Sequence, residues 1–243
     1  MKNYLVILSF LCCSLSYAQL QTGFKAGMGM ADLQSNSSSN NTYSSRQVFY
    51  GGVFLTIHLN GFLQLQPEIN YSPQGGQKTT VLLIPSEQNK NFPPGTPLYA
   101  RLKTTIVLNY LEFPVLAKMT FGRKFKYSVA MGPYIGILLS AKKKISGSSR
   151  LYTDESGTVP LTGNGAAGSV VSFNSTTNIY TDNKTINAGV QGGMSIQYAV
   201  GPGSVFLEWR SIIGGGNIHA GTQMEGRMGT SSLVFAAGYL IKL

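Results

Sequence analysis

The chain has 243 residues, with 19 Lys and Arg against 9 Asp and Glu, a formal net charge of +10 and a mean hydropathy of +0.05. Beyond the first residues no run approaches the roughly 18 consecutive apolar residues of a transmembrane helix, which argues against residence in an inner membrane. The basic residues form no coherent stripe along the sequence, so we expect no nucleic-acid partner.

The N-terminus has the anatomy of an export signal. Lys2 supplies a positive charge, Leu5 to Leu15 form an apolar stretch too short to span a bilayer, and Ser16-Tyr17-Ala18 is a small-x-small cleavage site. We therefore predict a cleaved signal peptide over residues 1–18 and a single domain over residues 19–243. The alternatives are a membrane anchor and a lipoprotein, but the residues before the two cysteines lack the small-residue pattern of a lipidation site.

Both cysteines, Cys12 and Cys13, leave with this signal. The mature chain would then contain no thiol, which excludes disulfides and thiolate metal sites. A cysteine-free chain also crosses an oxidising periplasm without mispairing.

Short and long connections alternate strictly along the rest of the chain. The tight ones are Asn60-Gly61, Gly122-Arg123-Lys124 and Gly201-Pro202-Gly203, and the long polar ones are 32–46, 73–103, 141–184 and 214–230. An outer-membrane barrel sorts its connections in this way, with short periplasmic turns on one rim and long extracellular loops on the other. The pattern predicts an all-β fold, an eight-stranded antiparallel up-and-down transmembrane β-barrel with both termini facing the periplasm. We expect Asn60-Gly61 to form a type I′ hairpin turn.

Hydrophobicity alternates with a period of two between these connections, as expected for strands with one face toward lipid. The first strand presents Phe24, Met28 and Met30 outward, and the last presents Leu233, Phe235 and Tyr239. The phase is blurred near Tyr110, where we expect a β-bulge. Several aromatic residues on the outward phase could form interfacial girdles: Tyr71, Tyr127, Tyr198, Trp209 and Tyr239.

Charged residues of both signs occupy the inward phase. We predict that they form a structural lumen network, with the members Lys25, His58, Glu68, Glu112, Lys118, Lys126, Glu208, Arg210 and Lys242. An eight-stranded barrel is just wide enough for side chains to fill its interior, and ionisable groups buried there are usually paired. A salt-bridged plug is therefore favoured, and a proton or ion pathway is the alternative.

Three segments resemble those of a known family: Leu65-Gln66-Pro67-Glu68-Ile69-Asn70-Tyr71-Ser72, Leu108-Asn109-Tyr110-Leu111-Glu112-Phe113-Pro114-Val115 and Met131-Gly132-Pro133-Tyr134-Ile135-Gly136. They are similar to segments of the PorT-like outer membrane protein beta-barrel family, often labelled porin-family proteins. The resemblance implies an outer-membrane barrel related in architecture to OmpA and OmpX. It also implies, as one alternative, a role in type IX protein secretion. The final strand, ending on Leu243, resembles the assembly signal of such barrels and implies the barrel-assembly machinery as a partner during biogenesis.

The third long connection is basic near its base. Lys142, Lys143, Lys144 and Arg150 are the candidates for contacts with lipopolysaccharide phosphates, because anionic headgroups attract Lys and Arg. The alternative is that these residues are simply solvated. Outer-membrane lipid is the partner that the barrel itself implies.

Nothing in the sequence carries a catalytic signature. His219 and Glu225, with loop serines, supply the residue types of a lipid A-modifying enzyme, but no motif fixes a nucleophile. We see no spacing typical of a metal site and no phosphate-binding loop, and we expect no cofactor. The sequence thus predicts a monomeric, non-enzymatic outer-membrane barrel whose long loops serve envelope integrity or surface interaction. A secretion component, a small porin and a lipid A-modifying enzyme are the alternatives.

Overall fold

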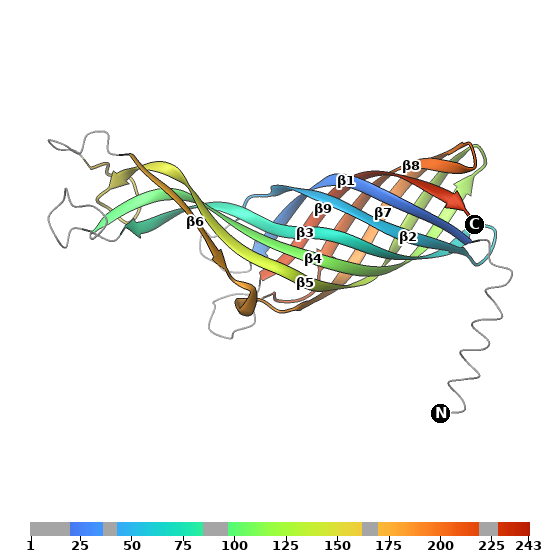
Figure 1. The fold of residues 1–243 in the computed structure, drawn as a ribbon, viewed down its shortest axis with the longest axis horizontal. Coiled ribbons are helices and arrows are strands. Elements are labelled where there is room, and N and C mark those ends of the chain that lie inside the picture. Colours follow the sequence, from blue (N-terminus) through green and yellow to red (C-terminus); the bar gives the residue numbers. More distant parts are fainter. Residues whose placement is uncertain (1–19, 36–42, 85–96, 162–169, 219–227) are drawn as a thin grey trace, which may run out of the picture.

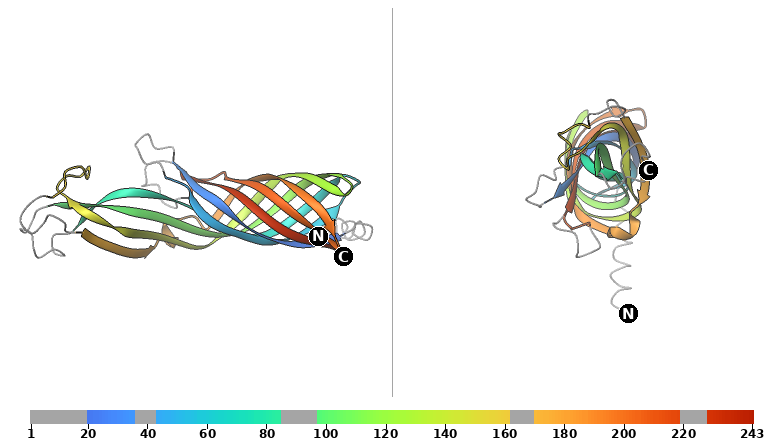
Figure 2. Two further views of the ribbon diagram at one scale, coloured as in Figure 1. Left: turned by 90° about the horizontal axis from the view of Figure 1, so that it is seen from above. Right: turned by 90° about the vertical axis from the view of Figure 1, so that its left-hand side faces the viewer.

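The computed structural model describes residues 20–35, 43–84, 97–161, 170–218 and 228–243. Eight of its nine strands close a ring in the order β1-β2-β3-β4-β5-β7-β8-β9, and every neighbouring pair is antiparallel (Figures 1 and 2). The strands are β1 Leu20–Ser35, β2 Arg46–His58, β3 Leu63–Ile84, β4 Leu98–Gly122, β5 Phe125–Tyr152, β6 Val170–Asn178, β7 Ile186–Val200, β8 Gly203–Gly214 and β9 Met228–Lys242, with a 3-10 turn, η3, at Tyr180–Asp182.

The predicted eight-stranded up-and-down barrel is therefore confirmed. The described ranges contain no helix with the length and apolar character needed to cross a bilayer. The predicted signal peptide over residues 1–18, with Cys12 and Cys13, lies outside the described residues, as do the Asn-rich part of the first loop and the loop residues His219 and Glu225.

The short connections all lie on one rim. Gln21 pairs with Lys242, and Leu20 pairs with Ile57 next to the first turn, so the start of β1, the end of β9 and the three turns share this end of the barrel. This is the periplasmic rim of an outer-membrane barrel.

The predicted type I′ turn at Asn60-Gly61 is wrong in its geometry. No described residue other than glycine has a positive φ, and Gly61 has none either. Instead Asn60 Oδ1 accepts hydrogen bonds from the backbone N–H groups of Phe62 (3.1 Å) and Leu63 (2.8 Å), which makes a wider turn stabilised by an Asn side chain.

The two faces of the strands differ in exposure as the alternation predicts. On the outer face Met28 is 72% and Leu207 67% exposed, while Lys25 and Arg210 on the inner face are each 2% exposed. Near the periplasmic rim, register places Phe24, Tyr239, Tyr198 and Phe125 in one row of the outer face. Such a row is typical of the aromatic girdle at a membrane interface.

The predicted irregularity near Tyr110 is present, but the extra residue lies on the neighbouring strand. Asn109 pairs with Ser140 whereas Tyr110 pairs with Leu138, so Leu139 of β5 has no partner in β4. Side chains at even positions of β4 stay buried through this point. The bulge therefore changes the phase of β5 and leaves that of β4 intact.

Three strands continue far beyond the barrel. β3, β4 and β5 have 22, 25 and 28 residues, whereas about 9–11 tilted residues cross a bilayer. Their outer parts pair with each other, and β6 pairs with β5 from Lys142 to Arg150. We call this four-stranded extension, residues 75–84, 98–107, 142–152 and 170–178, the projecting sheet; it extends to the left of the barrel in Figure 1.

Most of the described residues in two of the predicted polar loops, 73–103 and 141–184, thus lie in strands. The reason is a core that their many Ser, Thr and Lys residues obscure. Leu98, Ala100, Leu102 and Leu151 are 0–2% exposed and pack with Leu82, Ile145, Leu161 and Phe173. These segments bury apolar side chains against each other, and this burial offsets the conformational entropy lost when they become ordered outside the barrel.

Candidate functional site

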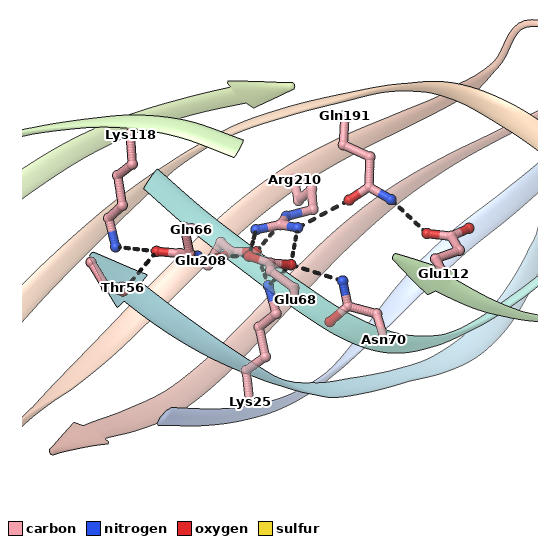
Figure 3. A network of polar contacts seen from close by, with 10 residues as sticks. All are labelled: Lys25, Thr56, Gln66, Glu68, Asn70, Glu112, Lys118, Gln191, Glu208 and Arg210. Carbon is pink, nitrogen blue, oxygen red and sulfur yellow. Dashed lines mark hydrogen bonds and ion pairs between the residues drawn. The ribbon is translucent and has the colours of Figure 1, made fainter. Parts of the chain in front are cut away.

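Four charged side chains meet at the centre of the lumen (Figure 3). Arg210 on β8 donates to both oxygens of Glu68 on β3, at 2.6 and 2.9 Å, and its Nε lies 2.7 Å from Glu208 Oε1. Lys25 Nζ on β1 lies 2.9 Å from Glu68 and 3.2 Å from Glu208. In the ring β3 and β8 lie on opposite walls, so the Arg210–Glu68 pair crosses the lumen.

Amide side chains extend this cluster. Gln66 and Asn70 donate to Glu68 at 2.6 and 2.8 Å, and Lys118 Nζ donates to Gln66 Oε1 at 3.0 Å. Glu68 therefore accepts hydrogen bonds at both oxygens from four different side chains. A buried carboxylate with this many donors can remain ionised in a dry interior.

Glu112 joins the network through amides. Gln191 Oε1 accepts from Arg210 at 3.0 Å, and its Nε2 donates to Glu112 at 2.5 Å. Gln74 donates to the other oxygen of Glu112 at 3.4 Å. Lys25, Lys118 and Arg210 are thereby balanced by Glu68, Glu112 and Glu208 within one connected set of hydrogen bonds, which we call the lumen network.

Apolar groups close the lumen around this network. Phe54, Phe206 and Leu240 pack together on the periplasmic side, and Phe54 meets Phe206 edge-on with ring centroids 5.6 Å apart. Another cluster contains Tyr50 and Tyr134, each 1–2% exposed. A cavity beside Lys118, Glu208 and Arg210 has a volume of only about 10 Å³, close to that of one water.

The remaining predicted members lie elsewhere. His58 and Lys126 are half-buried at the periplasmic mouth, where they line a separate polar cavity, and Lys242 is exposed next to the chain end. The prediction of a charge network is wrong for Lys242, because its strand position has the inward phase but lies beyond the closed part of the barrel. Period-two alternation gives the face of a residue and not its depth along the axis.

The basic residues Lys142, Lys143, Lys144 and Arg150 lie on β5 and not in a loop. All four are exposed, and Lys142 to Lys144 pair with β6 on one side and β4 on the other. Successive strand residues point to opposite faces, so without the bulge Lys142 and Lys144 would lie on the face opposite to the lipid-facing Ile137. The extra residue at the bulge reverses the phase, and the two lysines therefore lie on the same face as Ile137 and Leu139.

The amide members of the network are the residues that the prediction omitted. Gln66, Asn70, Gln74 and Gln191 are each at most 2% exposed. Their signal in the sequence is the inward phase that they share with the charged residues. Within the described residues there is no group of three or more His, Cys, Asp or Glu side chains placed to hold a metal ion.

Residues 16–219 match the model of a family described as "Outer membrane protein beta-barrel domain". A comparison with curated proteins finds no match. Among solved structures, Ail, the attachment invasion locus protein of Yersinia pestis, has 9% identity and a TM-score of 0.35, over 92% of this chain and 99% of that chain. Neisserial surface protein A has 15% identity and a TM-score of 0.39, over 92% and 97%.

The outer membrane protein OprG from Pseudomonas aeruginosa has 7% identity and a TM-score of 0.42, over 93% of this chain and 97% of that chain. The match to the family model covers seven of the eight barrel strands in full. The protein belongs to the outer membrane protein beta-barrel domain family and resides in the outer membrane.

Proposed function

We propose that this barrel is a non-enzymatic pedestal for surface interaction, and that the projecting sheet binds a partner outside the cell. The observation that carries this proposal is the length of β3, β4 and β5 together with the buried core at their outer ends. Ordering residues costs about 1–2 kcal/mol each. An extension that only had to close the barrel would not need a folded core.

The sheet is long enough to reach well past the membrane surface. β5 continues for 15 residues from Leu138 to Tyr152, and a strand rises about 3.3 Å per residue, so the reach is on the order of 50 Å along the strand. Its two inner strands, β4 and β5, have a paired neighbour on each side, which gives a more rigid binding surface than a free loop.

The tip of the sheet is also ordered by side chains. Asp154, which follows β5, accepts hydrogen bonds from the hydroxyl of Ser156 and from the backbone N–H groups of Thr158 (2.9 Å) and Val159 (2.7 Å). The hydrogen bond from Ser156 is the main cause that lowers the pKa of Asp154 well below its usual range. A fixed turn at the end of the projection is suited to contact with a partner.

The base of the sheet supports a role for the lysines at the membrane surface. Lys142 and Lys144 follow the exposed apolar residues Ile135, Ile137 and Leu139 along β5. Cations placed just above a lipid-facing belt attract anionic headgroups. We propose that these lysines, with Lys143 and the more distant Arg150, contact lipopolysaccharide phosphates and hold the sheet upright.

The filled lumen favours a pedestal over a small porin. The balanced lumen network and the apolar clusters on either side of it occupy the barrel interior. We therefore expect planar bilayers containing the protein to show no sustained conductance steps. Reproducible steps would contradict this part of the proposal.

The test of the proposed function is a trimmed variant. Residues 79–103 and 145–175 are each replaced by Asn-Gly, which joins strand partners that already face each other, Lys78 with Thr104 and Lys144 with Thr176. Cross-linking followed by pull-down from the native envelope and cell surface is compared between full-length and trimmed proteins. We expect a specific partner with the full-length barrel only, and equal recovery with a trimmed barrel that folds would refute the proposal.

The same pull-down tests one finer alternative, a role in protein secretion. A membership of the PorT-like branch with a role in type IX secretion requires secretion components among the captured proteins.

The non-enzymatic assignment requires identical lipid A mass spectra from wild-type cells, the deletion strain and cells with His219→Ala. A spectrum that changes in both mutants would contradict it.

A further inference from the structure

A second polar cavity lies at the periplasmic mouth of the barrel, separate from the projecting sheet. It has a volume of about 440 Å³, which is in the size range of small-molecule pockets, and it opens on the rim that carries the short turns. Its lining comes from the β2–β3 connection on one side and the β4–β5 connection on the other, and includes His58, Asn60, Gln64, Thr120 and Lys126.

The cavity is lined by hydrogen-bond donors. Asn60 Oδ1 already accepts two backbone N–H groups, and Gln64 Oε1 accepts a hydrogen bond from the Thr120 hydroxyl at 3.3 Å. These contacts engage the side-chain oxygens of two residues that line the cavity, so what their amides can still offer a ligand is the NH2 group. Gln64 is 7% exposed, so its amide is fixed within the wall and not free at the surface.

The charge of the cavity is positive. Lys126 lines it, and among the residues that the structure describes no side-chain carboxylate does so. Arg123 and Lys124 lie in the adjacent turn, and Lys242 is exposed on the same rim. The carboxylates of the lumen network do not line this cavity, and Lys118, which pairs in register with Gln64, donates to Gln66 within the network.

We infer that this cavity is a binding site for a small oxyanion-bearing molecule of the periplasm, a phosphate or a carboxylate. A positive cavity in which the side-chain oxygens of Asn60 and Gln64 are already engaged matches the oxygens of such a group. Lys126 supplies the charge, and the amides of Asn60 and Gln64 supply directed donors. The inference does not depend on the proposed role of the projecting sheet.

The test uses the full-length protein in nanodiscs of zwitterionic lipid, titrated with inorganic phosphate and, separately, with citrate. Binding is measured by calorimetry and by NMR shifts of the side-chain NH2 signals of Asn60 and Gln64. We expect saturable binding that shifts both amides. Lys126→Gln is expected to weaken it about tenfold, and Lys242→Gln, which removes an exposed charge on the same rim, less than twofold.

The lipid composition identifies the source of the anion. If an inner-leaflet headgroup occupies the site, nanodiscs containing phosphatidylglycerol will shift the two amides without added phosphate, and if the ligand is soluble they will not. Absence of saturable binding in zwitterionic discs, or an equal effect of the two lysine substitutions, would overturn the inference. The second outcome would mean that an adventitious ion only is attracted to the basic rim.

Discussion

Replacing Glu68 by Gln tests the lumen network at its most connected residue. The substitution keeps the size of the side chain and removes the charge that Arg210 contacts at 2.6 and 2.9 Å and Lys25 at 2.9 Å. Within the part of the chain that the structure describes, Glu208 is then the one carboxylate left in direct contact with these two buried cations. Breaking a buried ion pair by removing one partner costs about 3–5 kcal/mol, and we expect Glu68→Gln to lower the free energy of unfolding by that amount.

The double variant Lys25→Met/Glu68→Gln distinguishes charge balance from lost hydrogen bonds. It removes one charge of each sign, and the Met side chain fills the space of the lysine stem. We expect at least half of the lost stability to return, because no surplus cation is left in the interior. Lys242→Gln on the exposed rim serves as control and should change stability by less than about 0.5 kcal/mol.

The assay is equilibrium urea unfolding in lipid vesicles, followed by the fluorescence of Trp209, the only tryptophan of the chain. Trp209 lies on the outer face, 48% exposed and stacked on Phe235, so its emission reports loss of the lipid-facing wall. A Glu68→Gln barrel within about 1 kcal/mol of the wild type would refute the reasoning, as would a double variant less stable than the single one.

Three further predictions concern the turn, the core and the tip. Gly122→Ala should lower the free energy of unfolding by about 1–3 kcal/mol, because φ is +98° and a Cβ would lie 2.1 Å from a backbone carbonyl oxygen, while Gly61→Ala meets no atom within 4 Å and should have little effect; equal urea midpoints would contradict this. Leu102→Ala removes a side chain that is 1% exposed and should make the projecting sheet sensitive to protease while the barrel stays folded, whereas Leu83→Ala, at a position 60% exposed, should not; cleavage of both or neither would contradict it. The pKa of Asp154 is lowered in the folded protein, so its stabilising effect is present above the pKa of an unfolded aspartate and is lost only as the pH falls through the lower folded value. The backbone amides of Thr158 and Val159, which donate to Asp154, should therefore keep their NMR shifts below about pH 4. A titration midpoint of these shifts at or above that pH would refute the prediction.

The closed barrel was predictable because two independent signals agree on it. The alternation of Phe24, Met28 and Met30 with Lys25 gives the face of each residue, and the spacing of Gly122 and Gly201 places two of the turns. Lipid enforces both signals, since outward positions within the hydrocarbon are predominantly apolar and every strand must have a partner on each side.

The projecting sheet was missed because lipid does not constrain it. Outside the membrane, the outer face of a strand can be polar. Leu98, Ala100 and Leu102 do alternate with Tyr99, Arg101 and Lys103, but this run is short and lies within a long polar stretch that resembles a loop. The missing information is the long-range pairing of β3 with β4 and of β5 with β6. A single sequence does not contain the partners that make such a half-polar strand stable.

The lumen residues were predictable by face but not by depth. Glu68 and Arg210 occupy the inward phase, and so do His58 and Lys242, yet only the first two meet. Strand tilt and register decide which inward residues reach the same level, and both are set by closure of the ring. The position of the bulge at Leu139 could not be predicted for the same reason. The sequence shows an irregularity near Tyr110, but only the register of the two paired strands decides which of them carries the extra residue.

The distribution of the net charge follows from the filled lumen. Three cations and three carboxylates balance within the lumen network, and an additional unpaired charge there would cost several kcal/mol. The basic excess of the chain must therefore lie beyond the hydrocarbon, where water solvates it. It is found at the periplasmic mouth with Lys126 and at the base of the projecting sheet with Lys142 and Lys144. Because solvated charges remain available to ligands, both ends of this barrel are suited to bind anions while its interior is not.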